Sequence, residues 1–306
     1  MKRVIFLMIA AVAAFSACST APKYANRAEK LLAEINNPSS DYVMVASHRG
    51  DWRNYPENSL KAIESVINMG VDIVEIDLKM TKDSVLVLSH DKTIDRMFNG
   101  KGLVSDFTLD SLKTFRAKRA HNVATDSVRI ATLEEALLLC KDRILVNLDH
   151  AWTYYDAAIA VAEKVGVTDQ ILMKGKKSLA EVEAKLASHE GKFMYMPIID
   201  INKPSGKKLF EQYKEFGIDT QIAYEVCFQD LDDEALACMK AIVDGNSKVW
   251  VNTIWGSLCD YLDDDAAFEN GPEEYYGKVL DLGTTMIQTD RPEFLISYLR
   301  SRGLHD

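Results

Sequence analysis

The chain has 306 residues, of which 47% are hydrophobic and 27% charged, and its net charge is −10. The apolar fraction is sufficient for a sizeable core, and residues 41 to 306 have room for one large barrel or two small domains. The acidic balance argues against nucleic-acid binding, because phosphates need lysine and arginine neighbours, and against electrostatic docking on anionic lipid.

Residues 1 to 17 have the pattern of an export signal. A short basic start precedes an apolar run, residues 4 to 14, that is too short to span a bilayer. Phe15-Ser16-Ala17-Cys18 is similar to a bacterial lipobox, in which the cysteine is lipidated, although leucine is usual at position 15. We therefore expect an exported lipoprotein of the cell envelope or periplasm, anchored to a membrane through Cys18. Cleavage at another small residue, giving a soluble secreted protein, is the alternative.

After Cys18, residues 18 to 40 read as a polar linker and a helix around Ala25 to Ile35. From residue 41 to 306, strand-like apolar runs alternate with helical patterns, which implies a parallel sheet. The expected strands are Tyr42–Ser47, Ile73–Lys79, Ile144–Leu148, Ile171–Lys174, Phe193–Ile198, Thr220–Glu225, Lys248–Thr253 and Thr284–Gln288. Eight such units indicate an α/β fold of the closed (β/α)₈ type, a TIM barrel.

A ninth strand-like run, Val85–Ser89, follows the second strand too closely for a parallel crossover, so we expect an antiparallel hairpin with its turn near Asp83. This pairing would place His90 opposite Asp77 and on the same face. Residues 91 to 131 then form a small insertion or cap region.

Two carboxylates lie on the second expected strand. Glu75 and Asp77 are two residues apart and project to one face. Such close like charges repel unless a cation lies between them, and oxygen ligands favour Mg²⁺ or Ca²⁺. A half-exposed strand with its acids in solvent is the alternative, but the neighbouring residues leave no solvated face.

His48 and Arg49 follow the first expected strand, at the barrel end where active sites form. Arginine can bind phosphate through two hydrogen bonds, and histidine suits proton transfer near neutral pH. A single histidine or arginine in a loop is more often structural. Two histidines with an arginine and paired carboxylates at one barrel mouth predict a catalytic site.

These motifs together resemble the glycerophosphodiester phosphodiesterase family, whose barrel is of the phospholipase C-like type. The matching motifs are His48-Arg49-Gly50, Pro56-Glu57-Asn58-Ser59, Glu75-Ile76-Asp77, His90-Asp91, Thr132-Leu133-Glu134-Glu135 and Gln288-Thr289-Asp290-Arg291-Pro292. The resemblance implies the following roles: His48 and His90 as the general acid and base, Arg49 as the phosphate ligand, and Glu75 and Asp77 as ligands of a divalent cation.

The third metal carboxylate and a following lysine depart from the family pattern. Asp149 is found where the family has glutamate, and Ala151 where it has lysine. We expect Asp149 to complete the metal site. We expect Lys174, on the next strand, to supply the missing charge and to bind the substrate phosphate together with Arg49; a surface position for Lys174 is the alternative.

The resemblance implies metal-dependent hydrolysis of glycerophosphodiesters, small-molecule substrates, to glycerol phosphate and an alcohol. One alternative is a phosphodiesterase or phospholipase-like enzyme for another headgroup, such as glycerophosphoinositol. Another is a surface lipoprotein that binds without catalysis. The sequence does not indicate an oligomeric state.

Several remaining residues are expected to be structural. His150 should point away from the face of Asp149, and Asp263-Asp264-Asp265 should form a solvated acidic loop. Trp255 lies near the mouth, where we expect it to pack in its loop rather than cover substrate. We expect buried free thiols at Cys140, Cys227, Cys238 and Cys259, with a Cys227–Cys238 disulfide as the alternative.

Overall fold

The computed structural model describes residues 24 to 119, 122 to 189 and 193 to 306. The expected signal segment and Cys18 lie outside these ranges. Within them, none of the helices has the length and apolar character needed to cross a membrane.

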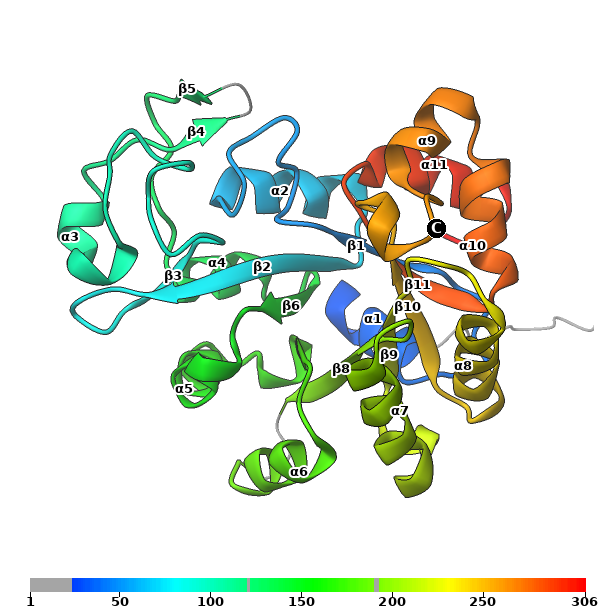
Figure 1. The fold of residues 1–306 in the computed structure, drawn as a ribbon. Helices are drawn as coiled ribbons and strands as arrows, with labels where there is room; N and C mark the ends of the chain where they lie inside the picture. Colours follow the sequence, from blue (N-terminus) through cyan, green and yellow to red (C-terminus); the bar gives the residue numbers. More distant parts are fainter. Residues whose placement is uncertain (1–23, 120–121, 190–192) are drawn as a thin grey trace, which may run out of the picture.

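Parallel strands close into a barrel at the centre of the described chain (Figure 1). Each strand pairs with its neighbours, and β1 pairs with both β2 and β11, which completes the ring. The eight barrel strands are β1 (Met44–Ser47), β2 (Ile73–Met80), β6 (Leu145–Asp149), β7 (Ile171–Gly175), β8 (Met194–Asp200), β9 (Ala223–Cys227), β10 (Lys248–Asn252) and β11 (Thr284–Thr289). The expected TIM barrel is confirmed. β9 begins later than expected because Ile218–Thr220 forms a 3-10 turn.

Helices follow the strands and cover the outside of the barrel (Figure 1). They are α2 (Leu60–Met69), α4 (Leu133–Cys140), α5 (Tyr155–Val165), α6 (Leu179–Ala187), α7 (Pro204–Phe216), α8 (Asp233–Asp244), α9 (Asp264–Asn270), α10 (Lys278–Asp281) and α11 (Pro292–Ser301). Local sequence sets where two of them begin. Thr132 with Glu135 at α4, and Ser178 with Glu181 at α6, form capping boxes that satisfy otherwise unpaired backbone N–H groups.

Helix α1 (Arg27–Ile35) closes the N-terminal end of the barrel. Leu31 and Ile35 are buried with Met44, Leu145 and Trp250 on the lower halves of the strands. Because this end is filled by side chains, the polar opening lies at the carboxyl ends of the strands, as is usual for this fold.

The hairpin after β2 is present, but the expected register is wrong by one residue. Leu78 pairs with Leu88 on β3 (Leu86–Leu88), and the Ser89 amide donates to the Asp77 carbonyl at 3.0 Å. Ser89, not His90, therefore lies opposite Asp77. His90 still reaches the barrel mouth because it lies beyond Leu88, the last paired residue of β3. The hydrogen bonds between β2 and β3 therefore no longer determine the direction of its side chain.

The segment from 91 to 131 contains α3 (Leu109–Leu112) and the short strands β4 (Lys118–Arg119) and β5 (Val123–Ala124). It extends from the hairpin on the side of the barrel away from α7 and α8 (Figure 1). A separate apolar cluster stabilises it, formed by Val87, Ile94, Met97, Phe98, Val104, Leu112, Ala117, Val128 and Ile130.

Candidate active site

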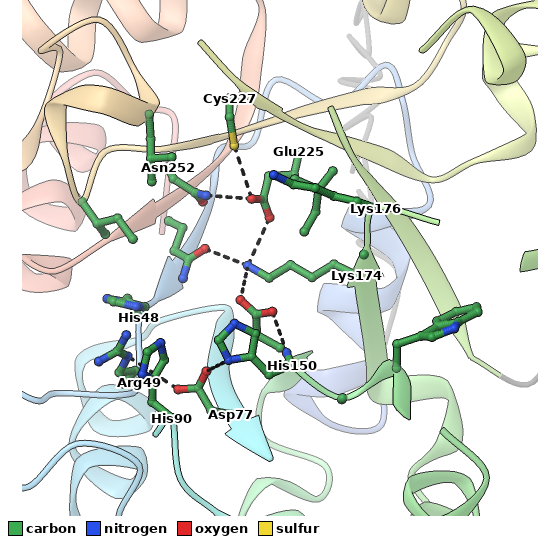
Figure 2. Close-up of a pocket in the computed structure, with 18 of the residues that line it drawn as sticks. His48, Arg49, Asp77, His90, His150, Lys174, Lys176, Glu225, Cys227 and Asn252 are labelled. Atoms are coloured by element: carbon green, nitrogen blue, oxygen red, sulfur yellow. Dashed lines mark hydrogen bonds and ion pairs between the residues drawn. The ribbon is translucent and has the colours of Figure 1, made fainter. Parts of the chain in front are cut away.

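A pocket of about 810 Å³ opens at the carboxyl ends of the barrel strands. His48, Arg49, His90 and Lys174 all line it, although they lie far apart in the sequence. Figure 2 shows these side chains converging from different strands and loops. The structure thus brings together the residues expected from the sequence to carry the chemistry.

His48 is held by a carboxylate behind it. Its Nδ1 lies 2.8 Å from Asp290 Oδ1, and its side chain is 9% exposed. The Trp52 indole also donates to this oxygen, at 2.6 Å, so Asp290 is fixed in turn. A carboxylate at Nδ1 sets the tautomer and leaves Nε2 available for proton transfer.

His90 has a similar partner. Its Nδ1 lies 2.7 Å from Asp91 Oδ1, and Arg96 donates to both Asp91 oxygens, at 2.8 and 3.1 Å. The hydrogen bonds from Arg96 lower the pKa of Asp91 to about 2, so this carboxylate stays ionised beside the imidazole. His48 and His90 therefore both present Nε2 while an aspartate orients the ring.

Glu75, Asp77 and Asp149 form a compact carboxylate cluster. Their ligand oxygens all lie within 4.8 Å of one another, and Glu75 and Asp77 are each only 1% exposed. Burial raises the pKa of Glu75 well above its usual range, and the nearby charges of Asp77 and Asp149 add to this. A divalent cation would relieve that repulsion, and an all-oxygen donor set suits Mg²⁺ or Ca²⁺. The residues present therefore fit the expected ion.

Arg49 and Asn58 connect the first loop to these carboxylates. Both have left-handed backbone, with φ of 55° and 54°. The Arg49 amide donates to Glu75 at 2.8 Å, and its guanidinium lies 3.1 Å from Glu57. Asn58 donates to the Asp77 carboxylate at 2.9 Å and accepts from the Asp77 amide at 3.0 Å. The Pro-Glu-Asn-Ser motif thus fixes Arg49 and Asp77.

Lys174 is buried inside the barrel and is not a surface lysine. Its Nζ lies 3.1 Å from Glu225, 3.3 Å from Asp149 and 3.3 Å from Gln288 (Figure 2). Although burial opposes ionisation, the charge of Lys174 holds the pKa of Asp149 at about 2. Asn252 donates to the other oxygen of Glu225 at 2.8 Å. Lys174 therefore places a fixed positive charge beside the carboxylate cluster.

Two expectations about neighbouring residues are wrong. His150 does not point away: its Nδ1 lies 3.4 Å from Asp77 Oδ1, because its φ of 51° ends the strand alternation. Asp264 is not solvated: it is 1% exposed and accepts hydrogen bonds from Thr253, Tyr276, Thr289 and the Asp290 amide. Neither position has a sequence signal, since each depends on backbone conformation or distant packing.

Trp255 lies at the mouth, half exposed, with its ring edge-on to His48 at a centroid distance of 5.6 Å. It lines the pocket rather than packing only within its loop. The four cysteines of the described residues are buried free thiols, as expected, so Cys227 and Cys238 do not form a disulfide.

The model of the glycerophosphoryl diester phosphodiesterase family matches residues 48–200, half of the chain. The chain belongs to this family. A second model, a domain of unknown function, matches residues 195–299. The family match covers the segment from His48 through the hairpin to Asp149 and Lys174, which includes most of the pocket residues described above.

A glycerophosphodiester phosphodiesterase of Caldanaerobacter subterraneus is 41% identical over 108 residues, which are 35% of this chain and 44% of that protein. The chain thus spans less than half the length of this relative. A putative glycerophosphodiester phosphodiesterase of Bacillus subtilis is 39% identical over 126 residues, 40% of this chain and 50% of that protein.

Solved structures of this family share the fold. A glycerophosphoryl diester phosphodiesterase from Parabacteroides distasonis superimposes with a TM-score of 0.75, at 23% identity, covering 90% of this chain and 92% of that one. A phosphodiesterase of Oleispira antarctica, solved in complex with the product sn-glycerol-3-phosphate, has a TM-score of 0.63 at 20% identity, covering 86% and 99%.

Proposed function

We propose that this protein hydrolyses glycerophosphodiesters to glycerol phosphate and an alcohol, using a divalent cation and two histidines. The observation that carries the proposal is the pairing of His48 with Asp290 and of His90 with Asp91 in one pocket. Arg49, Asp77 and Asp149 line the same space, and Glu75 lies next to the two aspartates, with its ligand oxygen within 4.8 Å of theirs. Family membership and the product bound to the Oleispira protein support the same chemistry.

In this mechanism Arg49 binds the phosphate oxygens and the histidines move protons at Nε2. One histidine accepts the proton of the attacking oxygen, and the other, protonated at the start, donates to the leaving alkoxide. Asp290 and Asp91 keep each ring oriented and stabilise its protonated form. Glu75, Asp77 and Asp149 would hold the cation, which supplies charge neutralisation for the phosphate when bound. The attacking oxygen is either water or a neighbouring glycerol hydroxyl, which would give a cyclic phosphate first.

The end of the third barrel strand is where this chain departs from the family pattern. Ala151 replaces the lysine of the family pattern, and we propose that Lys174 supplies that positive charge from the next strand. The absence of a lysine at position 151 is the observation that favours a different headgroup, for example glycerophosphoinositol.

We further propose that the protein is exported and held on a membrane by lipidation of Cys18. The support is the sequence alone: a short apolar segment followed by Ser-Ala-Cys. Membrane fractionation of a Cys18→Ser variant should show the protein released to the soluble fraction; retention in the membrane would contradict the anchor.

The function is tested with purified protein and a panel of glycerophosphodiesters with choline, ethanolamine, glycerol and inositol headgroups. We expect hydrolysis of at least one of them, loss of hydrolysis with a chelator, and recovery with Mg²⁺ or Ca²⁺. His48→Ala should lower turnover by about 10² to 10⁴. His189→Ala is the matched control, because His189 pairs with Asp156 outside the pocket. A folded, metal-loaded protein that hydrolyses none of these diesters would favour a binding protein without catalysis.

A further inference from the structure

A second group of potential metal ligands shares Asp77 with the carboxylate cluster. Asp77, His90 and His150 each offer one ligand atom, and these atoms all lie within 4.8 Å of one another. Figure 2 shows the side chains of His90 and His150 beside Asp77. Two of the three donors are nitrogen, so this group differs chemically from the all-oxygen cluster with which it shares Asp77.

The surroundings of both histidines fit metal ligation. His150 is turned toward Asp77 by its left-handed backbone, which its own amide supports by donating to Asp149 Oδ1 at 2.6 Å. The rings of His90 and His150 lie 5.0 Å apart. His90 has a carboxylate at Nδ1, the partner that metal-binding histidines commonly have on their second nitrogen, and Nε2 is left for the ion.

The donor set indicates which ion this group would bind. Imidazole nitrogen suits zinc and similar transition metals, whereas Mg²⁺ and Ca²⁺ prefer oxygen ligands. Two histidines and one carboxylate leave a fourth tetrahedral position open for water. Ligands around a zinc ion with bonds of about 2.1 Å lie roughly 3.4 Å apart. The side chains of His90 and His150 are 32% and 51% exposed. Rotation of these side chains can therefore shorten the distances between the ligand atoms to those around a zinc ion.

We propose that Asp77, His90 and His150 form a zinc site whose occupation inhibits the enzyme. A zinc ion bound at Nε2 takes the lone pair that His90 needs to accept a proton, so zinc binding and proton transfer at His90 exclude each other. The inhibition rests on the proposed function, while the binding site does not. His150 is the residue that distinguishes this site, because it belongs to neither the proposed catalytic pair nor the carboxylate cluster.

The binding test is calorimetric titration of Zn²⁺ into the intact protein in the presence of saturating Mg²⁺. We expect one zinc ion per chain, and an affinity at least tenfold weaker in His150→Ala. His189→Ala, which removes another aspartate-paired histidine away from the pocket, should bind zinc as the unaltered protein does. His150 is half exposed and follows the last residue of β6, so its replacement should leave the fold intact.

The inhibition test compares hydrolysis with and without Zn²⁺ within each variant. Zinc should lower the turnover of the unaltered protein and of His189→Ala. At the same zinc concentrations, His150→Ala should turn over substrate about equally fast with and without zinc. Zinc binding that is equally tight in His150→Ala, or that Mg²⁺ abolishes, would assign the ion to the carboxylates and overturn the proposal. Because the titration measures heat of binding, it gives its answer whether or not a tested diester is hydrolysed.

Discussion

Two histidine–aspartate pairs lie at the pocket and carry the proposed proton transfers. Asp290 follows the last barrel strand and Asp91 follows the hairpin, so each pair is assembled from a different part of the fold. In both pairs the aspartate binds Nδ1 and fixes which ring nitrogen carries the proton. Each aspartate should therefore matter for turnover without touching substrate.

Asp290→Asn tests this positioning role. The asparagine side chain can accept a hydrogen bond from His48 Nδ1 only when its Oδ1 faces the ring. When its amide group faces the ring instead, it stabilises the wrong tautomer of His48. We therefore expect kcat to fall by about 10² to 10⁴ with little change in KM. The control is Asp265→Asn, whose carboxylate pairs with Arg53 and Arg291 at the surface. A loss of less than threefold for Asp290→Asn would remove it from the proton-transfer mechanism.

The stability of a Lys174 variant tests how far the buried charges inside the barrel compensate one another. Its removal leaves Glu225 and Asp149 without their positive partner inside the barrel. Lys174→Met should therefore lower the free energy of unfolding by about 3–5 kcal/mol, and the double variant with Glu225→Gln should recover part of it. Lys240→Met, which removes an exposed ion pair with Asp244, should cost about 0–1 kcal/mol.

Activity of Lys174→Ala addresses the proposed phosphate role separately. We expect turnover per folded molecule to fall by more than a few-fold, because a cation beside Asp149 is lost. Turnover close to that of the unaltered protein would confine Lys174 to a structural role.

Sequence reasoning located most of the pocket residues because they follow strands of a barrel whose carboxyl ends meet at one mouth. It placed His48, Arg49, Glu75 and Asp77 there from alternation and strand order alone. It could not place His150, because a single left-handed residue reverses the direction that strand alternation assigns. Asp264 was missed because nothing in the local sequence distinguishes this buried acid from Asp263 and Asp265 on either side of it.

At the level of elements, the hairpin shows how turn geometry sets register. The Thr81 amide bonds to the Val85 carbonyl at 3.0 Å, and Ser84 between them has φ of 62°. This is a three-residue loop with one left-handed position, which glycine usually fills. Because serine fills it here, the sequence did not reveal the loop length, and the expected pairing was displaced by one residue.

Helix α9 begins at a buried acid that joins three elements. Burial raises the pKa of Asp264 to about 7, whereas an aspartate in an unfolded chain ionises near pH 4. Between these values the folded protein holds a proton that the unfolded chain has released. The resulting stabilisation is complete below about pH 4 and is lost as the pH rises through about 7.

Asp264→Asn should remove this pH dependence. We expect the free energy of unfolding of the unaltered protein, relative to the variant, to decline by up to roughly 4 kcal/mol between pH 4 and pH 7. Urea unfolding at several pH values measures the difference, and Asp265→Asn should follow the unaltered curve. Parallel curves for Asp264→Asn and the unaltered protein would show that Asp264 does not titrate in this range.

At the level of the whole molecule, the alternation of strands and helices was sufficient to predict the barrel, since a parallel sheet of eight such units closes on itself. The helix before the barrel was also expected from its local pattern. Its docking under the barrel was not, because the contacts of Leu31 and Ile35 with several strands exist only after closure. Helix α1 seals the N-terminal end of the barrel in this way. The carboxylates, the histidines and Arg49 therefore all lie together at the opposite end.

The central claim is that one pocket binds a cation and a phosphate between two histidines. The most direct measurement is a crystal structure of the protein with Mg²⁺ or Ca²⁺ and glycerol 3-phosphate. We predict an ion coordinated by Glu75, Asp77 and Asp149, and a phosphate bound by Arg49 within hydrogen-bond distance of Nε2 of His48 and of His90. A phosphate bound away from both histidines, or an ion that contacts none of the three carboxylates, would contradict the account.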